Sequence, residues 1–143
     1  MTKTPSDVKI LATGLTVTSD VDPYFRDLYG TPSEIKAKID ADIDAIHAAG
    51  FQITLKYVSD ASPEAIADSL DWLRNKLREE KFDGVMVGTG LRLIPQQTEL
   101  WEDVMNVIRE EAPQSVFMFN DGPGRNLWAL RRNKERLGIT TDY

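Results

Sequence analysis

Short runs of strand-forming residues alternate with amphipathic helical segments four times along this sequence. The strand candidates are residues 8–13, 51–58, 84–87 and 116–119. Strands that alternate with helices predict βαβ units and a parallel sheet, because parallel neighbours must be joined by a crossover connection. A length of 143 residues suits one domain. We therefore expect a single α/β domain over residues 1–143.

Local signals mark where the helices between these strands begin and end. A capping box, Thr-Pro-Ser-Glu at 31–34, starts the first helix, in which isoleucines recur at helical spacing until Gly50. Ser62 precedes a proline and starts the second helix. The third helix is expected over residues 98–111, and the last helix begins near Arg125.

The strand patterns also predict the order of the sheet. Residues 51–58 alternate between apolar and polar side chains, which indicates an edge strand, whereas 84–87 is apolar throughout, as in a covered central strand. With right-handed crossovers these positions give the order 2-1-3-4, a doubly wound flavodoxin-like or Rossmann-like sheet with helices on both faces. In that order the ligand crevice lies between the first and third strands.

Two glycine-bearing turns follow the third and fourth strands at this edge. They are Gly-Thr-Gly-Leu-Arg at 88–92 and Asn-Asp-Gly-Pro-Gly-Arg at 120–125. Exposed backbone amides together with a guanidinium suit a carboxylate or phosphate. The alternative is plain turn formation, with Arg92 paired to a surface acid. The predicted ligand-binding residues are Gly88, Thr89, Gly90, Arg92, Asn120, Asp121, Gly14 and Tyr24.

The connection from Gly14 to Gly30 is long for a loop between a strand and a helix. We expect it to be irregular and to cover the crevice. The groups available for acid–base chemistry are Asp20, Asp22, Tyr24, Tyr29 and Asp121, and no spacing singles out a catalytic pair. His47 is the only histidine and is expected on the surface near the end of the first helix. The sequence has no Gly-x-Ser-x-Gly elbow, the motif that would identify a nucleophilic serine. The sequence therefore assigns no catalytic residue.

Composition excludes several classes of partner. A net charge of −6 argues against a nucleic-acid partner, and the sequence has no cysteine and no His/Glu metal cluster. The 88–92 turn lacks the third glycine of a dinucleotide fingerprint, so no cofactor and no metal are predicted. No apolar stretch approaches the roughly 20 residues that span a bilayer, and the start lacks a signal-peptide pattern, so a cytoplasmic location is expected.

Two features leave an assembly role open. Residues 125–136 carry five basic side chains against one acidic side chain, which fits either a solvated face or a site for an acidic partner. Trp101, Met105 and Trp128 fit either the core or the centre of a dimer interface. A homodimer is therefore expected as the oligomeric state.

The stretch Phe-Asp-Gly-Val-Met-Val-Gly-Thr-Gly-Leu-Arg at 82–92 resembles a family of small bacterial and fungal α/β proteins that have no established activity. The resemblance continues through 100–108, the Ala-Pro at 112–113 and the Phe-Asn at 119–120, and in the first half only the helix start matches. The chain departs from the family pattern at Trp101, where phenylalanine is typical, and over 121–125. The resemblance implies the α/β architecture and a rim at Arg92 and Asn120, and it implies no reaction.

The leading hypothesis from the sequence is that the protein binds a small anionic ligand at the carboxyl edge of the sheet. One alternative is a small hydrolase, lyase or isomerase that uses an aspartate or tyrosine of the same rim. Another alternative is a homo-oligomeric interaction or assembly module.

Overall fold

A four-stranded parallel sheet with the order β2-β1-β3-β4 forms the centre of the molecule. The computed structural model describes residues 3–16 and 23–141. The strands are β1 (Lys9–Leu15), β2 (Gln52–Val58), β3 (Gly84–Val87) and β4 (Val116–Phe119). The order predicted from the sequence is confirmed, with β1 hydrogen-bonded to both β2 and β3.

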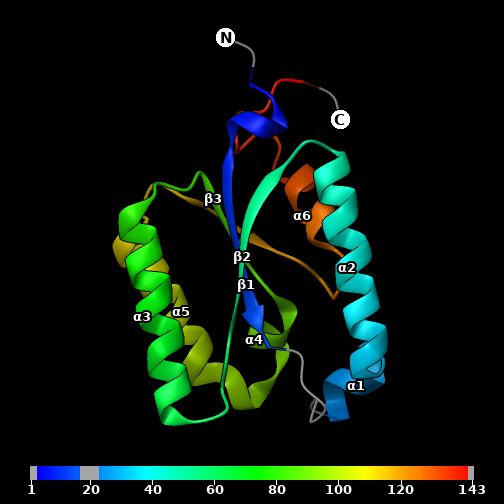
Figure 1. The fold of residues 1–143 in the computed structure, drawn as a ribbon, viewed down its shortest axis with the longest axis vertical. Coiled ribbons are helices and arrows are strands. Elements are labelled where there is room, and N and C mark those ends of the chain that lie inside the picture. The colour runs from blue at the N-terminus through cyan, green and yellow to red at the C-terminus, as the bar shows by residue number, and fades with distance from the viewer. Residues whose placement is uncertain (1–2, 17–22, 142–143) are drawn as a thin grey trace.

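Helices cover both faces of this sheet (Figure 1). On one face lie α2 (Pro32–Ala48) and α6 (Asn126–Arg132), which contact each other. On the other face lie α3 (Pro63–Glu79) and α5 (Thr98–Glu111). In this order β2 lies on one side of β1, and β3 and β4 lie on the other side, so the chain reverses its direction across the sheet after β2. Right-handed connections therefore place α2 on one face of the sheet and α3 and α5 on the opposite face.

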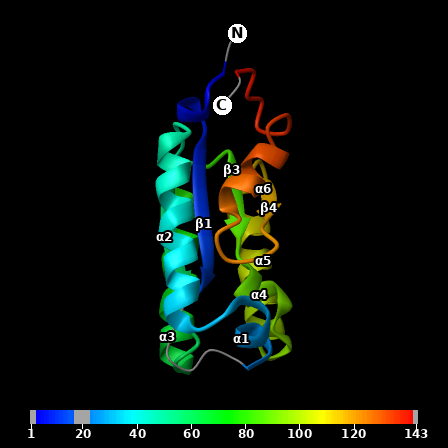
Figure 2. The ribbon, with the colours of Figure 1, turned by 90° about the vertical axis from the view of Figure 1, so that its right-hand side faces the viewer.

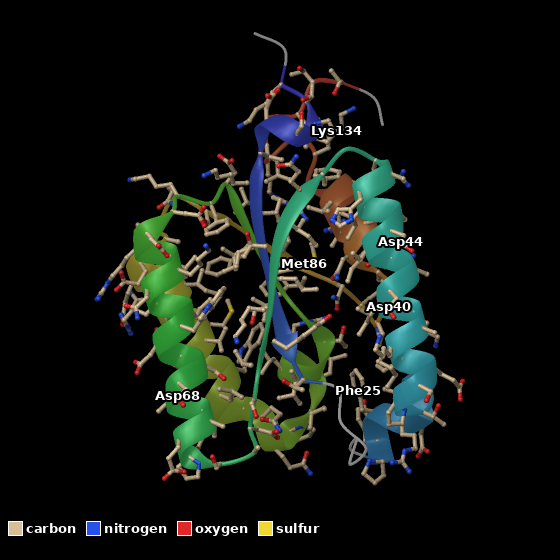
Figure 3. The ribbon with its side chains drawn as sticks, in the orientation of Figure 1. Phe25, Asp40, Asp44, Asp68, Met86 and Lys134 are labelled. Carbon is tan, nitrogen blue, oxygen red and sulfur yellow. The ribbon has the colours of Figure 1, made fainter. Side chains whose placement is uncertain are left out.

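The central strand β3 supplies side chains to both layers. Val85 and Val87 are completely buried against α3 and α5, and Met86 is buried against α2 and α6. Figure 3 shows Met86 between the layers, with Asp44 and Asp68 on the outer sides of α2 and α3. Because β3 is covered on both faces, its sequence has no polar alternation. The edge strand β2 is half-buried over most of its length.

The helix signals of the sequence are confirmed in detail. The Thr31 hydroxyl accepts a hydrogen bond from the Glu34 amide (3.3 Å), and the Glu34 carboxylate accepts one from the Thr31 amide (3.5 Å). Gly50, just beyond α2, has a φ of 94°, a conformation that glycine adopts without strain. The bounds of β3, β4 and α5 coincide with the predicted ones.

Two short helices differ from the sequence-based expectation. The segment 88–92, predicted as a turn, is instead the start of α4 (Thr89–Leu93), and the expected irregular connection contains α1 (Pro23–Tyr29). Helices of five and seven residues are too short to display a helical period, and they form because tertiary contacts bury their apolar residues. Leu91 of α4 is fully buried in the core between α3 and α5, and Phe25 of α1 is buried against neighbouring isoleucines.

The carboxyl ends of the strands lie at the end of the molecule that carries α1 and α4, opposite the two termini (Figure 2). The short 3-10 helices η1 (Pro5–Asp7) and η2 (Pro95–Gln97) complete the fold. Over the described ranges, no helix is both long enough and apolar enough to cross a membrane.

Candidate functional site

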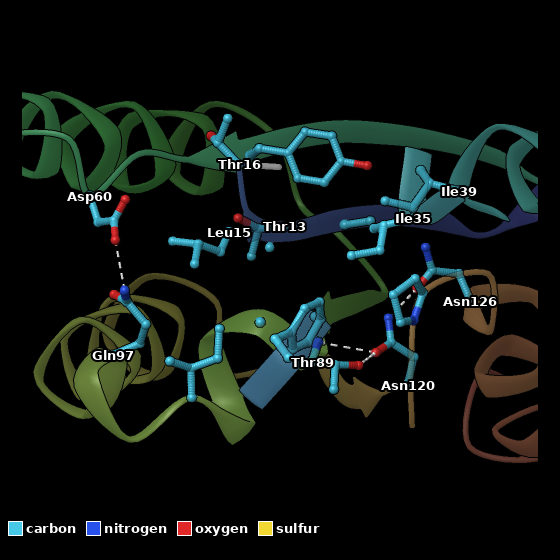
Figure 4. Close-up of a pocket in the computed structure, with 18 of the residues that line it drawn as sticks. Thr13, Leu15, Thr16, Ile35, Ile39, Asp60, Thr89, Gln97, Asn120 and Asn126 are labelled. Carbon is cyan, nitrogen blue, oxygen red and sulfur yellow. Dashed lines mark hydrogen bonds between the residues drawn. The ribbon is translucent and has the colours of Figure 1, made fainter. Parts of the chain in front are cut away.

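A cavity of about 610 Å³ opens at the carboxyl ends of β1 and β3 (Figure 4). Its walls come from the ends of β1 and β2, from α1 and α2, from the start of α4, and from the loop between β4 and α6. This is the point where the strand order reverses, which is the usual ligand site of open parallel sheets.

Two glycines form the floor of this cavity. The Gly88 amide donates to the Thr13 carbonyl oxygen (2.8 Å), so the chain leaving β3 lies against the end of β1. A Cβ atom on Gly88 would lie 3.3 Å from the Gly14 Cα and 3.4 Å from the Thr13 oxygen. Both contacts are with backbone, which cannot turn aside as a side chain can. Glycine at position 88 therefore permits the close approach of the two strand ends.

The Thr13 side chain lies in this floor with its hydrogen-bonding capacity unused. Thr13 is only 4% exposed and lines the cavity. Its Oγ1 atom is buried and has no hydrogen-bond partner among the residues that the structure describes. A buried hydroxyl of this kind carries a desolvation cost of about 1–3 kcal/mol unless a partner from outside the chain meets it.

A chain of hydrogen bonds orients the polar side chains at one end of the cavity. The Thr89 amide donates to Asn120 Oδ1 (3.1 Å), and the Thr89 hydroxyl donates to the same oxygen. The Asn120 Nδ2 in turn donates to Asn126 Oδ1 (2.6 Å). Asn120 is only 7% exposed, so its side chain is held in one orientation between α4 and the start of α6.

Asp42 of α2 holds the start of α6 against this wall. Its Oδ2 accepts from the Asn126 amide (2.8 Å), and its Oδ1 accepts from the Leu127 amide (3.2 Å). These amides belong to the first turn of α6, where backbone donors have no partner within the helix. The carboxylate thus serves as a cap supplied by another helix.

The opposite end of the cavity carries Asp60 and Gln97, and Tyr57 of β2 also lines the cavity. Gln97 Nε2 donates to Asp60 Oδ2 (2.7 Å), as Figure 4 shows. Burial raises the pKa of the Tyr57 hydroxyl, and the charges of Asp40 and Asp42 add to that effect. Tyr57 therefore stays protonated at neutral pH and can donate a hydrogen bond.

The wall between these two ends is apolar. It is formed by Phe25 of α1, Ile35 and Ile39 of α2, Leu55 of β2, and Ile94. Phe25, Ile35 and Ile94 also pack together as a small core cluster of their own. An apolar body with a few placed polar groups is the usual composition of a small-molecule pocket.

The structure brings five of the eight predicted site residues together and leaves three outside. Those that line the cavity are Gly14, Gly88, Thr89, Gly90 and Asn120. Arg92 does not line it. The Arg92 Nη2 donates to the Asn120 carbonyl oxygen (2.7 Å), and the guanidinium lies 5.8 Å from the centre of the Phe119 ring.

The other two predicted residues face elsewhere. Asp121 accepts from Arg125 Nε (2.8 Å), and this hydrogen bond lowers the pKa of the Asp121 carboxyl. Tyr24 is 55% exposed on α1. The predicted acids Asp20 and Asp22 lie outside the described residues.

Charge is scarce around the cavity. Asp60 is the only charged side chain in the described lining, which contains no lysine, arginine or histidine. His47 is exposed on α2, as expected. In the part of the chain that the structure describes, no group of acidic or histidine side chains is arranged to hold a metal ion.

Sequence reasoning missed several lining residues, above all Thr13, Tyr57, Asp60, Gln97 and Asn126. A signal for Thr13 was present, because it is the one polar residue among the buried positions of β1 and stands near the carboxyl end of that strand. Nothing local distinguishes Asn126, whose position depends on Asp42 and Asn120.

The aromatic residues considered for an interface are divided between core and surface. Trp101 and Met105 are half-buried against the core between α3 and α5. Trp128 is 38% exposed, and the Arg125 guanidinium lies 4.7 Å from its ring centre. The expected homodimer stays a prediction.

No protein-family model matches the chain, and no curated protein matches it. The resemblance of residues 82–92 and 100–108 to small bacterial and fungal α/β proteins therefore stays a prediction.

Proposed function

We propose that this protein binds a small molecule in the cavity at the carboxyl edge of its sheet. The observation that carries the proposal is Thr13, a residue of the cavity lining whose buried hydroxyl has no partner among the described residues. Once the Thr13 side chain turns its hydroxyl towards the cavity, a polar group of a bound molecule supplies the missing hydrogen bond. The unpaired Thr13 hydroxyl thus destabilises the empty protein, and its hydrogen bond to a ligand stabilises the complex.

The size and shape of the cavity support the same conclusion. Small-molecule pockets have volumes of roughly 300–1,000 Å³, and this cavity has about 610 Å³. It lies at the switch point between β1 and β3, where loops from several strands converge. The side chains of Asn120 and Asn126 are already fixed by hydrogen bonds, so little ordering entropy is lost there when a ligand binds.

An enzymatic function at the same rim has less support. Among the described lining residues, Asp60 and Tyr57 are the groups able to take part in proton transfer. Asp60 is hydrogen-bonded to Gln97, and no nucleophile with an adjacent base lines the cavity in the described ranges. Asp121, the predicted catalytic candidate after β4, is paired with Arg125 outside the cavity.

Substitution of Thr13 tests the proposal. Thr13→Val keeps the shape of the side chain and removes the hydroxyl, so we expect the free energy of unfolding of the empty protein to rise by about 1 kcal/mol. Binding of small neutral fragments to the cavity, followed by ¹H–¹⁵N NMR shifts of Gly14 and Thr89, should weaken. Thr13→Ser, which restores the hydroxyl, should recover binding.

Thr54→Val on β2 makes the same chemical change outside the cavity and serves as the control. Loss of stability in Thr13→Val, beyond that of Thr54→Val, would mean that the Thr13 hydroxyl already has a partner and would remove the basis of the proposal. Fragment binding that is equal in Thr13→Val and the unmodified chain would contradict the role assigned to the hydroxyl.

A further inference from the structure

The two ends of the cavity offer opposite hydrogen-bonding chemistry, and this difference defines the ligand more closely. At the Asn120 end, the amide orientations are forced. The Thr89 amide is a donor, so the atom of Asn120 that it meets must be oxygen. The Asn120 nitrogen therefore faces Asn126, whose side chain must present its own oxygen there.

This sequence of bonds leaves the Asn126 Nδ2 with two hydrogens and no acceptor among the described residues. Asn126 lines the cavity, and Figure 4 shows its nitrogen directed away from Asn120, on the side of Ile35 and Ile39. The backbone of Asn126 is fixed by Asp42, so the side chain cannot move away with the helix start. This end of the cavity therefore offers a donor to a ligand.

The Asp60 end offers acceptors. Gln97 uses its nitrogen to donate to one carboxylate oxygen of Asp60. The Gln97 Oε1 and the Asp60 Oδ1 have no donor among the residues that the structure describes. In Figure 4 the Asp60–Gln97 pair and the Asn120–Asn126 pair stand at opposite sides of the pocket, with Thr13 and Leu15 between them.

The charge of the lining argues against an acidic ligand. An anion in this cavity would find no cationic side chain in the described lining, whose one charged residue, the exposed Asp60, is itself acidic. Removing an anion from water without a countercharge is costly. Arg92 follows the lining residue Gly90 by two positions, but its guanidinium donates to the Asn120 carbonyl oxygen and lies near the Phe119 ring.

We infer that the ligand is an uncharged, elongated molecule with an apolar middle, a carbonyl-type acceptor that meets the Asn126 Nδ2, and a hydroxyl or amino donor that meets Asp60. This inference rests on the proposed function and departs from the anionic ligand expected from the sequence. Where it crosses the cavity floor, the otherwise apolar middle carries one polar atom, which meets the Thr13 hydroxyl as the proposed function requires.

The test is an NMR fragment screen on the full chain, with equal numbers of neutral, cationic and anionic fragments. The reporters are the ¹H–¹⁵N signals of Thr13, Gly14, Thr89 and Asn126. We expect most cavity binders to be neutral and to carry an amide or ketone carbonyl. Anionic fragments that bind as often as neutral ones would overturn the inference and leave the proposed function intact. If no fragment of any class shifts the cavity signals, the proposed function itself fails.

Asn126→Asp gives a second, sharper arm. Aspartate keeps an acceptor for the Asn120 nitrogen and replaces the cavity donor by an acceptor, so carbonyl fragments should bind about tenfold more weakly or worse. Asn75→Asp, an exposed position on α3, adds the same charge away from the cavity and should change nothing. Unchanged carbonyl binding in folded Asn126→Asp would overturn the donor assignment. The comparison of charge classes uses the unmodified chain, so it decides the inference even if Asn126→Asp does not fold.

Discussion

Asp42 of α2 connects its helix to α6 by accepting hydrogen bonds from Asn126 and Leu127, which lie 84 and 85 positions later in the sequence. It is only 7% exposed, and its two oxygens meet the first amides of α6. Aspartate is a common capping residue, although a cap normally comes from the chain just before the helix. Here the residue before α6 is Arg125, which makes no side-chain cap, so the cap comes from α2.

We expect Asp42→Ala to lower the free energy of unfolding by about 1–2 kcal/mol, the usual cost of removing a helix cap. Asp42→Asn keeps one oxygen acceptor and should cost less. Chemical denaturation measures both variants. Asp44→Ala, at an exposed position of the same helix, is the matched control and should stay within about 0.5 kcal/mol of the unmodified chain. A loss in Asp42→Ala no larger than in this control would refute the capping role.

At the scale of single elements, α1 is fixed over the cavity by contacts at both of its faces. Phe25 packs inward against Ile35 and Ile94. The Tyr29 hydroxyl donates to the Asp121 carbonyl oxygen (3.0 Å), and burial raises the pKa of that hydroxyl, so it remains a donor. A Cβ atom on Gly122 would lie 2.8 Å from the Tyr29 ring, so glycine at 122 leaves room for the ring.

Gly122→Ala should therefore displace the Tyr29 ring and loosen α1, at a cost of about 1–3 kcal/mol. Trypsin cleavage after Arg26, an exposed residue of α1, reports that loosening. Tyr29→Phe removes only the hydroxyl bond and should have a smaller effect on the cleavage rate. If Gly122→Ala is cleaved after Arg26 no faster than the unmodified chain, the anchoring contact is not what holds α1.

The helices α3 and α5 are joined by ion pairs centred on Glu111. Its carboxylate accepts from Arg78 Nε (2.7 Å) and from Arg74 Nη1 (2.8 Å). The hydrogen bond from Arg78, followed by the bond from Arg74, lowers the pKa of Glu111. A carboxyl group with a lowered pKa in the folded state stabilises the fold while it is ionised.

This contribution is complete above the ordinary glutamate pKa of about 4.3 and is lost as the pH falls through the lowered value in the folded state. Glu111→Gln should therefore be less stable than the unmodified chain at pH 7, and the two should converge below pH 4. Thermal unfolding as a function of pH measures this convergence. The exposed Glu102→Gln on α5 provides the control, and a constant stability difference between Glu111→Gln and the unmodified chain at all pH values would contradict the assignment.

At the scale of the whole molecule, the two ends of the chain close the fold opposite the cavity. The Thr140 amide donates to the Lys3 carbonyl oxygen (2.9 Å), and the Lys3 amide donates to the Thr140 hydroxyl (2.8 Å). Leu137 and Ile139 are buried in the core between the sheet and the α2–α6 layer. The segment after α6 thus belongs to the core, although it forms no helix or strand.

Leu137→Ala should lower the free energy of unfolding by about 2–5 kcal/mol, because it leaves a cavity in a packed core. Fragment binding at the opposite end of the molecule should persist in the folded fraction. The neighbouring exposed Glu135→Ala controls for the loss of a side chain in the same segment. Denaturant unfolding that gives equal stabilities for these two variants would place Leu137 outside the core.

The sequence by itself determined the order of the elements and most of their bounds. The capping box before α2, the apolar run of β3 and the alternation in β2 are local patterns, and each reflects the burial of the residues that form it. From these patterns the sheet order follows, and with it the edge at which the cavity lies. Gly14, Gly88 and Asn120 were predicted as site residues because they stand at the ends of strands, and all three line the cavity.

Only the tertiary structure decided what faces the cavity. Arg92 was predicted to contact the ligand, but packing of α4 turns its guanidinium to Phe119. Asn126 enters the lining because Asp42 of another helix holds its backbone. Side-chain direction at a sheet edge depends on contacts between segments distant in the chain. The local periodicity of the sequence does not depend on those contacts. The polar and charged side chains that line the cavity could therefore be identified only from the folded molecule.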